Sequence, residues 1–267
     1  MGPDSEKILK AIASMMRVIF ALMLRETKTR YGRLKIGYLW AFLEPMLFIT
    51  MLSAIFTYVR NLNSSTMPQI LFYVTGIMPF FLFRNVMIQT MYAVRANYQL
   101  LTFPQVHAFD LMIARALLEL ATFIVVITVL VSVIGVTGIN PVDVEDYLGL
   151  YQAVFLISLL GMAGGFTASA LIPMFPSVQI IITGVLIRPL FFISGVFFTA
   201  DVIPEKFRAY ALLNPLLQLI ELFRSSFFHE YESQHVDLKY IYGSVLCILF
   251  FGLLIQRALR RFSMRIA

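Results

Sequence analysis

The sequence has little charge, one cysteine and few histidines. Only 13% of its 267 residues are Asp, Glu, Lys or Arg, whereas 60% are hydrophobic, and the mean hydropathy is +0.83. Soluble domains carry about 25% charged residues, so this composition excludes an ordinary soluble domain and indicates a multi-pass membrane protein. Because Cys247 is the single cysteine, no disulfide can form within the chain. His107, His229 and His235 are scattered and form no metal-ligand pattern, so we expect no metal site.

Motifs for phosphate binding and hydrolysis are also absent. The sequence contains no GxxxxGK[ST] phosphate loop, no GxSxG and no HExxH. We therefore expect no catalytic residues and no cofactor in this chain. If the protein is a pump, ATP and magnesium must be bound by a partner subunit. The net charge of +6 does not predict a nucleic-acid partner, because the basic residues gather near the two ends of the chain.

Long apolar runs are what the sequence has in abundance. A helix needs about 20 apolar residues to cross the hydrocarbon core, and the amphipathic pattern before the first run suits an interface helix. We expect an all-α integral membrane protein with a single domain over residues 1–267, both termini being cytoplasmic. The expected spans are 38–58, 70–92, 111–136, 148–172, 178–198 and 241–259. The expected regions are 1–36 (cytoplasmic interface helix), 37–199 (spans one to five), 200–239 (external re-entrant segment) and 240–267 (span six and cytoplasmic tail).

Charge decides how residues 207–228 are interpreted. Basic residues before the first span and at the end of the last one place both termini inside, which requires an even number of crossings. The acidic loop 137–147 fits the external side. Residues 207–228 must then enter and leave on one side, and Asn214–Pro215 is a natural break between two half-helices of a re-entrant hairpin. The alternative is a pair of amphipathic helices lying flat on the outer surface.

Several charged side chains fall inside the predicted spans, where each is costly to insert. At 1.5 Å per residue, Glu44 lies about 9 Å and Arg84 about 12 Å from the same face. Arg115 and Glu119 are four residues apart and share a helix face. We expect these four to form a buried ionic cluster. It either locks the helices together or takes part in gating or in binding an anionic headgroup.

Arg188 lies in the middle of span five and precedes Pro189. A helix kink there would expose the cation to an internal aqueous path for an anionic substrate, whereas the alternative is that Arg188 snorkels to a backbone carbonyl. Aromatic rings could line the same path, because a sugar polymer slides along apolar rings; packing is the plainer reading for each of them. The candidate rings are Phe80, Phe81, Phe191, Phe192, Phe197 and Phe198.

The loop 93–110 between spans two and three is the longest cytoplasmic loop and mixes polar with apolar residues. A short helix ending before Pro104 could insert into a groove of a soluble subunit. The candidate coupling residues are Arg95, Asn97, Leu100, Leu101 and Phe103. A basic stretch before span one could contact lipid headgroups, the ATPase partner or an anionic substrate; it comprises Arg25, Lys28, Arg30 and Arg33.

Five stretches, in this order and spacing, carry a family resemblance: LRETKTRYGRLKIGYLWAFLEP (24–45), GIMPFFLF (76–83), ARALLE (114–119), RPLFFISGVFF (188–198) and NPLLQLIELFR (214–224). Together they resemble the transmembrane subunits of ABC-2 type exporters of bacterial capsular polysaccharide and related O-antigen chains, and the capsule branch more closely. Arg84 is not expected from that family, so its pairing with Glu44 rests on the depth argument.

The resemblance implies a homodimer of six-span permeases with two nucleotide-binding ATPase subunits in the bacterial inner membrane. It implies that the loop after span two is a coupling helix and that re-entrant helices lie between spans five and six. The substrate would be a lipid-linked anionic polysaccharide, passed on to periplasmic and outer-membrane polysaccharide export proteins.

Two other functions stay open on the sequence alone. The first is a permease for O-antigen, teichoic acid or another amphiphile. The second, from a different class, is a membrane-embedded glycan-modifying enzyme, for which the candidate residues are Asp201, Glu205, His229 and His235.

Overall fold

The computed structural model describes residues 3–31, 37–60, 69–137, 144–228, 231, 233 and 235–266, and these ranges are entirely helix and connecting turns, without strands. The all-α prediction is therefore confirmed for this part of the chain. The long helices are α1 (Pro3–Tyr31), α2 (Gly37–Arg60), α3 (Gln69–Ala96), α4 (Ala108–Thr137), α5 (Tyr147–Leu171) and α10 (Leu238–Ile266). The shorter elements are η1 (Tyr98–Thr102), α6 (Ser177–Ile180), η2 (Ile181–Leu186), α7 (Ile187–Ile193), η3 (Ala200–Val202), α8 (Glu205–Ala211) and α9 (Pro215–Ser225).

Four helices of the described chain are long and apolar enough to cross a membrane: Gln69–Ala96, Ala108–Val136, Tyr147–Leu171 and Leu238–Leu259. They coincide with predicted spans two, three, four and six. Predicted spans one and five fall on shorter apolar helices, Leu39–Ile55 and Ser177–Ile193.

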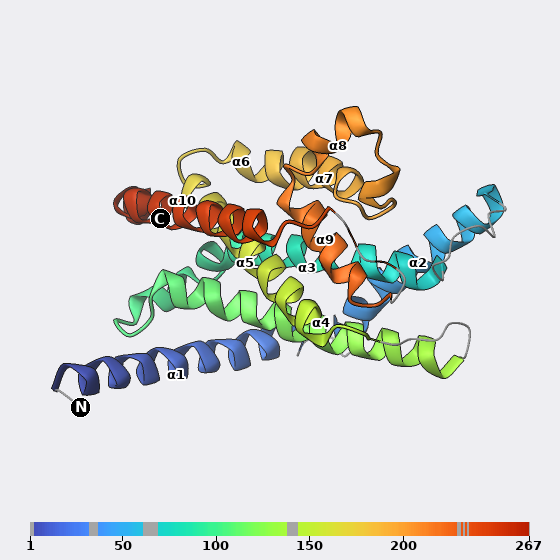
Figure 1. Cartoon of the computed structure of the whole chain (residues 1–267). Helices are drawn as coiled ribbons and strands as arrows, with labels where there is room; N and C mark the ends of the chain where they lie inside the picture. Colours follow the sequence, from blue (N-terminus) through green and yellow to red (C-terminus); the bar gives the residue numbers. More distant parts are fainter. Residues whose placement is uncertain are drawn as a thin grey trace.

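Helix α3 lies at the centre of the molecule and packs against α2, α4, α5 and α9, while α10 packs on the other side of α5 (Figure 1). The most apolar window of α3 is 78% buried, whereas that of α10 is only 17% buried. The apolar surface of α10 is therefore left for lipid or a partner as far as the described residues show, because they do not cover it.

Close approach of α5 to α3 depends on Gly161 and Gly165, which are four residues apart and share one face. A Cβ at Gly161 would lie 2.9 Å from the Phe83 carbonyl oxygen, and one at Gly165 would lie 2.6 Å from the Thr90 Cβ. Small residues at this spacing let two membrane helices come close enough for extensive van der Waals contact.

Helix α1 runs beside α4 at the bottom of Figure 1, and its beginning and the end of α10 lie on the same side of the view. Its apolar residues Ile12, Met16 and Phe20 are more than half exposed. Since these residues recur at four-residue steps, they form one exposed apolar stripe, as expected for a helix lying at a membrane interface.

The helical segment formed by α6, η2 and α7 ends at Ile193, so the expected end of span five at residue 198 is wrong. Ser194 leaves helical geometry and Gly195 adopts φ +74°. That left-handed conformation suits glycine and stops the helix. The chain turns there, and Phe197 and Phe198 belong to the turn rather than to the span.

Candidate transport and coupling sites

We use the term coupling end for η1, the turn 103–107 and the parts of α1, α3 and α4 around them. The predicted short helix in this loop is present as η1, and it ends before Pro104. Asn97 precedes it and is 7% exposed. Its side chain accepts a hydrogen bond from Arg25 Nη1 at 3.0 Å and donates to the Ala93 carbonyl oxygen at 3.2 Å. Arg25 is thus fixed to the start of η1.

Glu26 continues this network into the membrane helices. It accepts a hydrogen bond from Asn97 Nδ2 at 3.5 Å and forms an ion pair with Arg115 of α4, in which both side chains are 12% exposed. The sequence analysis did not consider Glu26 as a partner for Arg115. The pairing depends on where α1 lies along α4, which no local pattern indicates. One carboxylate therefore links the interface helix, the coupling loop and a membrane span.

The other predicted coupling residues differ in exposure. Arg95 and Phe103 are exposed, whereas Leu100 and Leu101 are partly buried and pack against a small core that includes Ala93 and Leu111. The exposed side chains are available to a partner, and the packed leucines hold η1 on the helices. Of the predicted headgroup contacts, Arg25 and Lys28 are exposed, Arg30 lies in the last turn of α1, and Arg33 lies outside the described residues.

The predicted pairing of Glu44 with Arg84 is present. Arg84 Nη2 donates to Glu44 Oε1 at 2.7 Å, and the guanidinium also lies 4.2 Å from the centre of the Phe81 ring. Glu119 is 4% exposed on α4. Arg115 forms an ion pair with Glu26, a residue that the predicted four-residue cluster did not include.

Arg188 lies on an exposed face of the α6–η2–α7 segment. Phe192, one turn further on, is 62% exposed, and Val185, one turn before, is 63% exposed. The preceding η2 is a π-helix, a wider turn that is frequently found at functional sites. Arg188 and Phe192 can therefore meet a substrate or a second chain.

The remaining candidate rings pack with one another. Phe80 and Phe81 are 2% and 5% exposed, and the Phe191 ring lies 4.9 Å from that of Phe80 and 5.0 Å from that of Phe197. In this arrangement Phe80 joins α3 to α7, whereas the Phe81 ring lies 5.5 Å from that of Phe48 and joins α3 to α2. Phe198 is half-buried in the turn after Gly195. Phe192, which stacks on Phe197 at 5.6 Å, is the candidate ring that stays most exposed.

A buried ion pair that sequence reasoning missed lies in α9. Arg224 and Glu221 have side chains that are 0% and 1% exposed, with Nη1 and Oε1 3.1 Å apart. Arg224 Nη2 also donates to the Gly195 carbonyl oxygen at 2.8 Å, and the guanidinium lies 4.2 Å from the centre of the Phe72 ring. The signal was available, because Glu221 and Arg224 are three residues apart in an otherwise apolar helix.

Glu221 also hydrogen-bonds to a segment before α9 and to a segment after it. It accepts hydrogen bonds from the Ala200 backbone N–H at 3.3 Å and from the Tyr231 hydroxyl. Burial and the Glu221 carboxylate raise the pKa of Tyr231, so the hydroxyl stays protonated and donates. We call Glu221, Arg224, Tyr231 and the turn 194–200 the hairpin anchor.

Asn214 and Pro215 separate α8 from α9, at the break that the sequence predicted. The Asn214 side chain caps α9 by accepting from Leu216 N at 3.1 Å and donates to Ser194 Oγ at 3.0 Å, and Pro215 occupies the first turn. The break is therefore a capped helix start that is also bonded to the turn after α7.

Of the four candidate residues for an enzymatic site, two lie in contact with each other. His235 Nε2 lies 3.1 Å from Asp201 Oδ1, Glu205 lies in the first turn of α8, and His229 is outside the described residues. Among the described residues, no three His, Cys, Asp or Glu side chains are grouped to hold a metal.

Comparison with known proteins places these features in a family. The family model described as ABC-2 type transporter matches residues 17–228. The polysialic acid transport protein KpsM of Escherichia coli is 35% identical over 89% of this chain and 91% of its own length. The capsule polysaccharide export inner-membrane protein BexB of Haemophilus influenzae is 30% identical over 95% of each chain. The O-antigen export system permease protein RfbA of Klebsiella pneumoniae is 24% identical over 84% of this chain and 86% of its own.

Proposed function

Because the chain belongs to the ABC-2 type transporter family, we propose that it is the membrane subunit of an ATP-driven exporter that moves lipid-linked capsular polysaccharide across the bacterial inner membrane. The observation that carries this proposal is the match to relatives named for polysialic acid transport and capsule polysaccharide export. Their identity of 30–35% extends over 89–95% of this chain. The similarity between this chain and each relative therefore extends over most of both sequences and is not confined to one shared helix.

The proposed topology has six crossings, with α2 and the α6–η2–α7 segment as the first and the fifth. Both termini face the cytoplasm, since basic residues flank the first and the last span. The helices α8 and α9 re-enter from the outer side. The capped break at Asn214–Pro215 and the burial of α9 against α3 and α5 support this, because backbone breaks at membrane depth require surrounding protein.

The proposed assembly has two copies of this chain and two ATP-hydrolysing subunits. Exposed apolar residues on α2, including Leu47 and Met51, and on the fifth span, including Ile181 and Val185, are available to the second copy. The ATPase would bind at η1, where Phe103 is 57% exposed. This chain contributes no ATP or magnesium site of its own.

The proposed path for the polymer runs along the exposed face of the fifth span. Arg188 offers a cation to an anionic sugar, and Phe192 offers an apolar surface without fixed hydrogen bonds. The polymer would then pass to periplasmic and outer-membrane polysaccharide export proteins.

Deletion of the gene, with measurement of capsule on the cell surface and of polymer inside the cell, tests the function. We expect surface capsule to be lost and lipid-linked polymer to accumulate inside, both being restored by the wild-type gene. Co-purification with the ATPase should yield a complex that hydrolyses ATP. Accumulation of O-antigen in place of capsule would favour the O-antigen alternative, for which the 24% identity to RfbA is the supporting observation. Glycan turnover by the isolated chain would contradict both transport proposals.

A further inference from the structure

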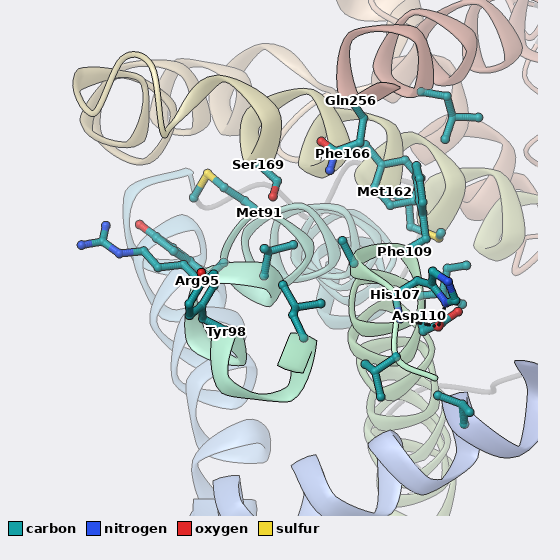
Figure 2. Close-up of a pocket in the computed structure, with 18 of the residues that line it drawn as sticks. Met91, Arg95, Tyr98, His107, Phe109, Asp110, Met162, Phe166, Ser169 and Gln256 are labelled. Carbon is teal, nitrogen blue, oxygen red and sulfur yellow. Dashed lines mark hydrogen bonds and ion pairs between the residues drawn. The ribbon is translucent and has the colours of Figure 1, made fainter. Parts of the chain in front are cut away.

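A large cavity lies at the coupling end. Its volume is about 1400 Å³, and its walls come from α1, α3, η1, α4, α5 and α10 (Figure 2). Pockets for drug-sized ligands occupy about 300–1,000 Å³, so this cavity has room for a longer molecule.

Polar and apolar groups are separated along the cavity. The helices α3, α5 and α10 finish at the coupling end, where Arg95, Ser169 and Gln256 line the wall. Further back along the same helices the lining is apolar and includes Leu159 and Leu249. At 1.5 Å per residue, Ser169 and Leu159 are about 15 Å apart along α5. The cavity therefore carries polar groups at the coupling end, with Asp110 and Pro173 also in the wall there, and has an apolar interior that runs into the membrane-spanning part of the helices.

Gln256 gives the mouth a specific hydrogen-bonding requirement. The residue is 8% exposed, and its Oε1 accepts no hydrogen bond from any described residue. Figure 2 shows its amide pointing toward the space that Ser169 and Phe166 also face. A buried acceptor without a donor costs about 1–3 kcal/mol, so a ligand that supplies a donor would be favoured here.

Apolar side chains that line the cavity also favour a ligand with apolar groups. Met15 of α1 is 42% exposed and Leu253 of α10 is 38% exposed, and both line it. Contact of such surface with water is unfavourable. Arg95 is exposed and projects outward at the edge of the cavity (Figure 2). Its positive charge favours a ligand that has a negatively charged group at this edge.

We propose that this cavity binds one membrane phospholipid, with its acyl chains between α1, α5 and α10, its phosphate beside Arg95 and a headgroup donor on Gln256 Oε1. Phosphatidylethanolamine and phosphatidylglycerol have this chemistry, since each combines a phosphodiester with an N–H or O–H donor. A soluble subunit does not reach the apolar interior, because that part of the wall belongs to the spanning helices Tyr147–Leu171 and Leu238–Leu259. The lipid fills the space between the interface helix and the bundle, and the site is separate from the exposed face that carries Arg188.

The test is native mass spectrometry of the exporter with its ATPase subunit, in nanodiscs of phosphatidylethanolamine and phosphatidylglycerol, prepared from cells that make no polysaccharide. Gln256→Leu removes the acceptor, and Ala11→Phe places a ring in the cavity from the exposed face of α1. Gln179→Leu makes the same chemical change in α6, away from the cavity.

We expect wild type and Gln179→Leu to retain one phospholipid per chain. Gln256→Leu should lower that occupancy about tenfold, which is the loss expected for one hydrogen bond to a charged or strongly polar group. Ala11→Phe should lower it as well, because its ring takes up space that the acyl chains would fill. If Gln256 has only a structural role, Gln256→Leu should lower thermal stability and leave the amount of bound lipid unchanged.

Three results would overturn the proposal. The first is equal lipid retention in all four proteins. The second is retention only after the ATPase subunit has been removed, which would assign the cavity to that subunit. The third is replacement of the phospholipid by the lipid terminus of the polymer in cells that make polysaccharide, which would assign it to the substrate.

Discussion

The hairpin anchor and the coupling end use similar residues in different surroundings. In the anchor, the side chains of Glu221 and Arg224 are buried, and both are bonded to the turn 194–200. At the coupling end, the side chains of Glu26 and Arg115 are each 12% exposed, and the helices that carry them, α1 and α4, also form walls of a cavity of about 1400 Å³. Segments with few buried contacts open at low free-energy cost. The comparison indicates that the anchor holds one end of the molecule rigid, whereas the coupling end is the part where movement costs less.

Arg224→Met should have the largest effect, because it leaves the Glu221 carboxylate buried without its cation. Breaking a buried pair from one side costs about 3–5 kcal/mol. The free energy of unfolding in detergent, measured by SDS titration, should fall by about that amount. Arg208→Met is the matched control, since among the described residues the Arg208 side chain donates to the carbonyl oxygens of Asp201 and Ile203 and to no carboxylate.

The double variant Glu221→Leu/Arg224→Met should regain part of the loss, because it leaves no unpaired charge. Equal stability of Arg224→Met and Arg208→Met would show that the anchor does not hold the hairpin.

Gly76→Ala should have the next largest effect on the same measurement. A Cβ at Gly76 would lie 2.5 Å from the Val196 carbonyl oxygen, so α3 and the turn 194–200 must move apart. Overpacking of this kind costs about 1–3 kcal/mol. Gly135→Ala serves as control, since a Cβ there meets nothing within 4 Å and alanine favours a helix by about 1 kcal/mol. A neutral Gly76→Ala would mean that the turn is not tightly packed on α3.

The ion pair of Glu44 and Arg84 is less buried than the anchor pair. It can be tested with the single variants Glu44→Gln and Arg84→Gln and with the double variant. The side chains of Arg84 and Glu44 are 21% and 31% exposed, so this pair is less enclosed by protein than the anchor pair. We expect a coupling free energy of about 1 kcal/mol, well below that of the anchor. If the effects of the single variants simply add in the double variant, the two charges do not interact.

The contrast also explains which contacts the sequence predicted. Apolar runs predicted the helices, and the chemistry of proline predicted the break at Asn214–Pro215. The rise per residue of a helix was enough to predict that Arg84 approaches Glu44. Glu26 with Arg115 could not be found in this way, because it depends on the register of α1 along α4. The early end of the fifth span could have been found, since Ser194–Gly195 interrupts the apolar run and glycine permits the positive φ that stops a helix.

Asn97→Ala should have the smallest effect on stability and the most specific effect on transport. Asn97, the residue immediately before η1, hydrogen-bonds to Arg25 and Glu26 of the interface helix. One hydrogen bond contributes about 1 kcal/mol, so unfolding should change by no more than that. If the ATPase moves η1 and α1 together through Asn97, the amount of polymer exported per ATP hydrolysed should fall about fivefold in vesicles. Gln99→Ala, at an exposed position of the same short helix, should leave that ratio unchanged. A proportional fall of ATP hydrolysis and export in Asn97→Ala would instead mean that Asn97 only helps the ATPase to bind, and the coupling end would then be a docking surface rather than a moving part.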